Sequence, residues 1–183
     1  MNDEFRKPDT SSWPRIGLLT AALAFIADRV AKYVLVEQVM RPPGMGDTPF
    51  FTDKQVELLP VFNLRMAWNY GISFSLFNSG SPLHLVLLIV MQSAITIALV
   101  WYMWRLNGRW MQIAAGLIVG GALGNIFDRL IYGGPVADFF DFHLGEWHFA
   151  TFNVADSFIS IGVVLWLLDA VRSASHHAPA PDA

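Results

Sequence analysis

The stretch FNVADSFISIGVVLWLL, residues 152–168, decides the fold because it places a carboxylate, Asp156, in an apolar run of the kind that crosses membranes. An ionised Asp among lipid-facing residues costs about 2.5–3.5 kcal/mol on insertion scales. Such a residue is retained only where a partner or a function requires it. The rest of the chain has to supply that partner or that function.

The composition of the whole chain indicates a membrane protein. Of its 183 residues, 54% are hydrophobic and only 15% are charged, which is too apolar for an ordinary soluble domain. The formal net charge of -3 offers no basic surface for nucleic acid. The chain has no Cys, so disulfides, thiolate metal sites and a cysteine nucleophile are excluded. Its five His residues form no HExxH motif, which argues against a zinc peptidase.

Four apolar runs predict four membrane-spanning helices, at about residues 16–36, 83–104, 111–132 and 152–171. The first run follows a basic N-terminus, as in a signal peptide, but no small-x-small cleavage site ends it. We therefore interpret it as a retained helix. Four spans put both termini on one side of the membrane, and the density of Lys and Arg in the short flanking segments favours the cytoplasmic side.

The connection between the first two runs has a different character, because it contains the chain-breaking residues Pro42, Pro43, Gly44 and Gly46. Short β-branched or aromatic segments follow at 56–68 and 71–77. They predict a small extracytoplasmic β-sheet over about 48–78, near the end of the third span and the start of the fourth. The predicted fold class is membrane all-α: a four-transmembrane-helix bundle with this sheet between helices 1 and 2. Residues 1–172 form one integral membrane domain, and 173–183 are expected to be a disordered tail.

Charged residues inside the predicted spans need partners. Asp28 and Lys32 are four residues apart, so they share a helix face and can neutralise each other. Asp128 follows the small residues GGALG (120–124), which would let another helix approach closely. Its neighbour Arg129 is its expected counter-charge. A structural role is the favoured interpretation of both carboxylates.

Asp138 and Asp156 lie on the predicted outer side. Asp138 follows a helix-ending turn made by Gly133, Gly134 and Pro135, and Asp156 is about one turn into the fourth span. If the segment between them is a hairpin, the two carboxylates meet at one depth, so the partner of Asp156 is another Asp. Asp141, three residues after Asp138 in an extended segment, should point elsewhere.

Two carboxylates in a partly dry site cannot both ionise cheaply, so they share one proton. This is the chemistry of an aspartic peptidase, in which the ionised member takes a proton from the attacking water. The protonated member hydrogen-bonds the peptide carbonyl and later protonates the leaving amine. The same pair fits a proton relay in a membrane transporter, or a purely structural role. From these residues alone the three interpretations stay open.

Five blocks occur in order along the chain: DRVAK (28–32), NLRMAWNYGISFS (63–75), GGALGNIFDR (120–129), VADFFDF (136–142) and FNVADS (152–157). Together they resemble the bacterial lipoprotein signal peptidases, also called signal peptidase II. The resemblance covers most of residues 14–172. Each block is weak alone, but five ordered blocks with a matching topology are specific.

The resemblance implies that Asp138 and Asp156 are the catalytic dyad of an aspartic endopeptidase and that Asn153 orients Asp156. It also implies substrate-binding or supporting roles for Asp28, Lys32, Asn69, Gly71, Asn125, Asp128 and Arg129. The family removes signal peptides from diacylglyceryl-modified prolipoproteins, cleaving on the amino side of the lipidated Cys. The implied location is the bacterial cytoplasmic (inner) membrane, with the active site near the extracytoplasmic face.

The implied partners are these prolipoproteins, membrane lipids and globomycin-type inhibitors, and neither a metal nor an organic cofactor is implied. The alternative is a proton-coupled transporter that uses the same Asp pair. A transporter needs polar residues along a path through the membrane, whereas the inner halves of the second to fourth spans are almost uniformly apolar. The peptidase is therefore the favoured prediction.

Overall fold

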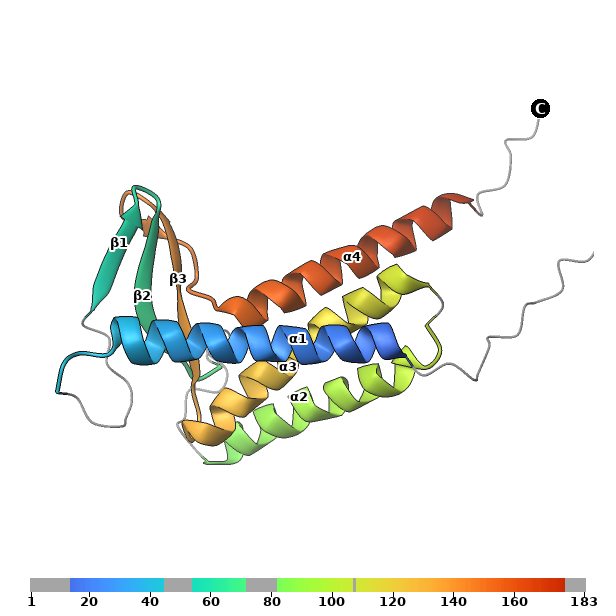
Figure 1. Ribbon diagram of the computed structural model, residues 1–183, viewed down its shortest axis with the longest axis horizontal. Coiled ribbons are helices and arrows are strands. Elements are labelled where there is room, and N and C mark those ends of the chain that lie inside the picture. The colour runs from blue at the N-terminus through green and yellow to red at the C-terminus, as the bar shows by residue number, and fades with distance from the viewer. Residues whose placement is uncertain (1–13, 45–53, 72–81, 107, 177–183) are drawn as a thin grey trace, which may run out of the picture.

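The computed structural model of the protein describes residues 14–44, 54–71, 82–106 and 108–176 (Figure 1). Its four α-helices are α1 (Arg15–Lys32), α2 (Pro82–Met103), α3 (Arg109–Ile131) and α4 (Val154–His176). Each coincides with one predicted apolar run to within a few residues. Because α4 continues to His176, residues 173–176 are helical and do not belong to a disordered tail. Residues 177–183 lie outside the described part of the chain.

The first helical segment is longer than predicted. After Lys32 it continues as a π-helix, η1 (Tyr33–Met40), whose residues Val36 and Met40 are fully buried. It ends at Arg41, which has φ -59° and ψ 126°. The residue before a proline avoids the helical region, so Pro42 stops the helix here.

Three helices in the described part of the chain are long and apolar enough to cross a membrane: Leu85–Met103, Arg109–Ile131 and Val154–Arg172. Large apolar side chains on their outer faces are exposed, as expected for surfaces that meet lipid. Helix α1 is not among the three, and it carries Asp28, Arg29 and Lys32 near its end. These features are those of a helical membrane protein.

Helix α3 contacts the other three helices. Its glycines allow this, since a Cβ added to Gly116 would lie 2.5 Å from the carbonyl oxygen of Gly17 on α1. A Cβ on Gly124 would lie 2.5 Å from Oδ2 of Asp28. The close approach predicted from the GGALG segment is confirmed.

A four-stranded antiparallel sheet has the order β1 (Gln55–Leu59), β2 (Phe62–Asn69), β3 (Val136–Leu144) and β4 (Trp147–His148). The prediction that the sheet comes only from the connection between helices 1 and 2 was therefore incomplete. Strands β3 and β4 come from the connection between α3 and α4. The sequence of β3, VADFFDFHL, was not predicted to be a strand because its charged residues interrupt the apolar pattern. Of the segment predicted at 71–77, only Gly71 is described.

The sheet lies at the end of the bundle where α3 ends and α4 begins (Figure 1). Its core joins Val36 and Met40 of η1 to two residues from each central strand: Leu64, Met66, Ala137 and Phe139. This packing fixes β3 against the helical bundle. Strand β3 carries Asp138 and the first turn of α4 carries Asp156, so the fold brings both to the same end of the molecule.

Candidate active site

Strand β3 is held directly against the segment that leads into α4. The backbone N–H groups of Phe139 and Phe140 both donate to the carbonyl oxygen of Phe152, at 3.1 and 2.9 Å, and the N–H of Phe152 donates back to Phe140 at 3.1 Å. Asp138 and Asn153 are the neighbours of these paired residues. The hairpin predicted to bring Asp138 and Asp156 together is thus built by backbone hydrogen bonds.

Asn153 caps α4 and holds Asp156 in place. Its Oδ1 accepts a 3.0 Å hydrogen bond from the N–H of Asp156, while its own N–H donates to Oδ2 of Asp156 at 3.2 Å. This reciprocal arrangement is a capping box, which satisfies two N–H groups that the helix leaves free. Asn153 therefore contacts Asp156 through both its side chain and its backbone.

The same side chain also reaches Asp138. Nδ2 of Asn153 donates to Oδ1 of Asp138 at 2.6 Å and to Oδ1 of Asn125 at 3.2 Å. Asn125 in turn donates from Nδ2 to Oδ1 of Asp156 at 2.8 Å. Two asparagine amides, both buried, thus connect the two carboxylates.

Asp138 is almost fully buried, with 2% of its surface exposed. Besides Asn153, it accepts a 3.1 Å hydrogen bond at Oδ2 from Nδ2 of Asn69. Burial, and next the nearby charge of Asp156, raise the pKa of Asp138 to about 7. The hydrogen bonds from Asn69 and Asn153 act in the opposite direction without cancelling this effect. Near neutral pH, both the protonated and the ionised form of Asp138 are therefore populated.

Gly71 supports the site through Asn69. The N–H of Gly71 donates to Oδ1 of Asn69 at 2.8 Å, which turns the Asn69 amide so that its Nδ2 faces Asp138. Gly71 has φ +82°, and a Cβ at this position would lie 2.6 Å from Cδ1 of Leu88. The turn therefore requires glycine.

Arg129 does not pair with Asp128, which corrects the sequence-based expectation. Its Nη1 donates to the carbonyl oxygens of Gly134 at 3.1 Å and Asn69 at 3.3 Å, and its Nε donates to Oε1 of Gln92 at 3.3 Å. Asp128 faces α1, whereas the Arg129 guanidinium reaches α2 and the end of β2, so the two residues meet different neighbours. Arg129 ties the end of β2 to the turn before β3.

Asp128 instead belongs to a buried ion cluster between α1 and α3. Lys32 Nζ lies 2.6 Å from Asp128 and 3.1 Å from Asp28, so the predicted Asp28–Lys32 pair is confirmed within a larger group. Arg29 Nη2 lies 2.7 Å from Asp28 and 2.6 Å from Asp128. Each carboxylate therefore contacts both cations, which offsets the desolvation of all four charges.

The ion cluster also holds the backbone on both sides of the site. Asp28 Oδ1 accepts a 3.1 Å hydrogen bond from the N–H of Ala155, the residue before Asp156. Asp128 Oδ2 accepts one of 3.1 Å from the N–H of Ala137, the residue before Asp138. Asp28 and Asp128 thus connect the ion cluster to the backbone of α4 and β3, next to the two acids.

Arg29 is the member of this cluster that sequence reasoning missed. Its side chain is 19% exposed, and its guanidinium lies 5.0 Å from the centre of the Phe127 ring. The sequence contained a sign of this role. If Asp128 pairs with Arg129 and Asp28 with Lys32, Arg29 lies inside a predicted span with no carboxylate as its partner. A cation in that environment requires a carboxylate.

Asp141 is separate from this arrangement, as predicted. Although only 1% exposed, it faces away from Asp138 and contacts Nδ1 of His148 at 2.9 Å. The site therefore consists of Asp138 and Asp156, two asparagines that bridge them, and a charged support beneath. The structure thus brings a buried carboxylate, Asp138, and a half-buried one, Asp156, into one hydrogen-bonded network.

Comparison with known proteins matches residues 20–172 to the family described as "Signal peptidase (SPase) II". A lipoprotein signal peptidase of Rhizorhabdus wittichii is 35% identical over 90% of this chain and 91% of its own length. One of Sphingopyxis alaskensis is 40% identical over 85% of this chain and 84% of its own. A solved structure described as a bacterial membrane enzyme superposes with a TM-score of 0.69 at 28% identity, covering 91% of this chain and 94% of that one. None of these matches favours a transporter.

Proposed function

Because the chain belongs to the signal peptidase II family, it removes signal peptides from prolipoproteins, and we propose that Asp138 and Asp156 are its aspartic catalytic dyad. The observation that carries this proposal is the contact of Asn153 with both carboxylates. One buried side chain donates to Asp138, accepts from the backbone of Asp156 and caps the helix whose first turn carries Asp156.

The two acids divide the chemistry. Asp138, with its pKa near 7, holds the shared proton and donates a hydrogen bond to the oxygen of the scissile carbonyl. Ionised Asp156 removes a proton from the water whose oxygen attacks the carbonyl carbon. When the tetrahedral intermediate collapses, the C–N bond breaks and the leaving nitrogen receives a proton from the dyad. The two protons and the water oxygen are then all accounted for in the amine and acid products.

The asparagines and the ion cluster keep this pair in position. Asn69, Asn125 and Asn153 present N–H donors to carboxylate oxygens, so they fix the direction in which each acid points. Asp28 and Asp128 fix the backbone before each acid. Such preorganisation avoids reorienting the groups during the reaction.

The substrate is a prolipoprotein that already carries a diacylglyceryl group, and cleavage occurs on the amino side of the lipidated Cys. A substrate held in the bilayer by its signal helix and two acyl chains presents the scissile bond near the membrane interface. The site lies where α3 ends and α4 begins, which is the end of two apolar helices and therefore at such an interface. Globomycin-type cyclic peptides would occupy the same site.

Helix α1 also crosses the membrane, so that with α2, α3 and α4 the protein has four spans in the bacterial cytoplasmic membrane. Its outer face carries an exposed apolar stripe of Leu19, Leu23, Ile26 and Val30. Asp28, Arg29 and Lys32 turn inward to the ion cluster and do not face lipid. Both termini are then cytoplasmic, and the sheet and the dyad are extracytoplasmic.

The orientation is tested by cysteine labelling, for which the Cys-free chain provides no background. In intact cells, a membrane-impermeant maleimide should label Glu146→Cys in the turn between β3 and β4. Arg109→Cys, at the start of α3, should be labelled only after the cells are opened. The reverse pattern would place the dyad on the wrong side for this substrate.

The reaction is tested by a gel-shift assay with purified protein and a diacylglyceryl-modified prolipoprotein. We expect a product shorter by the signal peptide, absent when globomycin is added. The matched control is the same prolipoprotein without its diacylglyceryl group, which should be cleaved poorly. Equal cleavage of both forms would contradict the role given to the lipid.

A further inference from the structure

A second polar site lies on the sheet, away from the dyad. Side chains alternate between the two faces of a strand, so Asp141 and His143 project from the face of β3 opposite to Asp138. Strand pairing places Asn63 beside Asp141 and Glu57 beside Asn63, while His143 pairs with His148. One face of the sheet is thus polar across all four strands.

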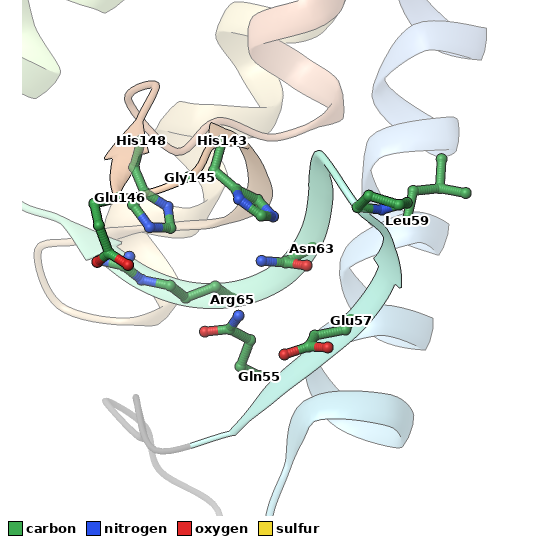
Figure 2. A pocket seen from close by; sticks show the side chains of 10 residues that line it. Gln55, Glu57, Leu59, Asn63, Arg65, His143, Gly145, Glu146 and His148 are labelled. Carbon is green, nitrogen blue, oxygen red and sulfur yellow. The ribbon is translucent and has the colours of Figure 1, made fainter.

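Glu57, Asn63, His143 and His148 help to line a cavity of 330 Å³ (Figure 2). Its charged and polar lining residues are Gln55, Glu57, Asn63, Arg65, His143, Glu146 and His148. Figure 2 shows that these side chains come from β1, β2, β3, β4 and the turn between β3 and β4. The volume is at the small end of the range of about 300–1,000 Å³ for ligand sites, which suits a single small group.

Two buried atoms at this cavity lack hydrogen-bond partners within the described part of the chain: Oδ1 of Asn63 and Nε2 of His143. Asn63 itself is only 2% exposed. Leaving a buried acceptor unpaired costs about 1–3 kcal/mol. Because buried polar groups nearly always have partners, these two atoms indicate a ligand that supplies them.

The lining determines the chemistry of that ligand. Glu57 and Glu146 contribute two carboxylates against the one guanidinium of Arg65. Buried Asp141, which lies behind the cavity, contacts Nδ1 of His148 at 2.9 Å and so leaves Nε2 as the ring nitrogen available to a ligand. The described residues contain no group of His, Cys, Asp or Glu arranged to hold a metal ion. The site therefore favours a cation that carries N–H donors.

We propose that the cavity between Asn63, Glu57 and Glu146 binds a guanidinium or primary ammonium group. Oδ1 of Asn63 accepts one N–H from the bound group, and the two carboxylates balance its charge. The group belongs either to a basic side chain of a polypeptide substrate or to a free small amine. Only the first source rests on the proposed function, since binding itself does not involve the dyad.

Binding is tested by NMR of the full chain in detergent, with ¹³C-labelled histidine rings. The His143 and His148 signals are assigned with His143→Gln and His148→Gln. We expect n-propylguanidinium to shift both signals saturably. Tetramethylammonium has the same charge but no N–H donor, so at equal ionic strength it should leave them unchanged. Equal shifts with both cations, or no saturation with the first, would overturn the proposal.

Variants identify the contacts. Glu57→Gln and Glu146→Gln should each weaken n-propylguanidinium binding about two- to fivefold, as expected for exposed charge pairs. Asn63→Leu removes the acceptor and should abolish the saturable shift, while dispersed His143 and His148 signals show that the sheet is folded. The matched control Asp169→Asn, far away on α4, should bind normally. Normal binding by Asn63→Leu would also overturn the proposal.

A second assay distinguishes the two sources of the group. Two lipidated prolipoproteins are compared that differ only in Lys or Gln in the segment after the lipidated Cys. A lower KM for the Lys substrate, lost in Glu57→Gln, assigns the site to a substrate side chain. Equal KM values together with the NMR shifts assign it to free amines. Binding seen by NMR in a preparation that cleaves nothing would show that the proposed function failed while the site remains.

Discussion

Nδ2 of Asn153 lies 2.6 Å from Oδ1 of Asp138, and this hydrogen bond joins the start of α4 to strand β3. The same residue caps α4 through Asp156. One side chain therefore performs a structural task and a positioning task, which substitution can separate.

Asn153→Ser tests the positioning task. Serine caps helices about as well as asparagine, but it is too short to reach Asp138. We expect a folded protein and a fall in kcat of about 10- to 100-fold, because Asp138 loses a hydrogen-bond donor that fixes its direction while the helix cap is kept. The control Asn153→Ala should lose the cap as well, at about 1 kcal/mol of stability. A normal kcat for Asn153→Ser would show that the bond to Asp138 has no role in cleavage.

The pH dependence of cleavage should follow Asp138. The dyad acts with one proton, and the pKa of Asp138 is about 7. We expect kcat/KM to fall above about pH 7, approaching about tenfold per pH unit as that proton is lost. The profile is measured between pH 5 and 9 with lipidated substrate. A flat profile up to pH 9 would contradict the assignment of the shared proton to Asp138.

Thermal stability should depend on pH through the same group. Between its ordinary pKa of 3.8 and about 7, Asp138 binds more proton in the folded state than in the unfolded state. Stability from this group is therefore full at low pH and is lost as pH rises through that window. Asp138→Asn should flatten this part of the Tm profile and be the more stable protein at pH 8. An unchanged slope would mean that Asp138 is not desolvated.

The ion cluster should behave as one coupled unit. Lys32→Met leaves Asp28 and Asp128 with only Arg29, and we expect it to cost about 3–5 kcal/mol of unfolding free energy. Asp128→Asn should cost less in the Lys32→Met background than alone, because the two charges interact. The control is Arg129→Gln, in which the effect of Asp128→Asn should be unchanged. Coupling of Asp128 to Arg129 instead of Lys32 would contradict the contacts described above.

The helices and the placement of Asp138 and Asp156 at one end of the bundle were predictable because they depend on local signals. Apolar runs set the four helices, and glycines and a proline before Asp138 marked the turn that returns the chain to Asp156. The resemblance also pointed to Asn69, Gly71, Asn125 and Asn153. Their contacts are consistent with supporting roles, and their function in cleavage stays a prediction.

The contacts that the sequence did not predict are those made between distant segments. Strand β3 forms because β2 offers it a free edge, which the charged pattern of VADFFDFHL does not reveal. The partner of Asp128 was wrongly predicted because chain neighbours were considered, whereas α1 supplies Arg29 and Lys32 across the helix interface. The polar cavity on the sheet depends on how the residues of four strands pair with one another. The sequence alone does not give this pairing, so the cavity was not predicted.

The most direct test of the dyad is the cleavage rate of lipidated prolipoprotein by purified Asp138→Asn and Asp156→Asn, beside Asp169→Asn as a matched control. Each dyad substitution preserves side-chain size and removes the acid–base function, so kcat should fall by at least about 100-fold while the protein stays folded. Asp169→Asn should cleave at the normal rate. Full-rate cleavage by folded Asp138→Asn or Asp156→Asn would contradict the assignment of the dyad.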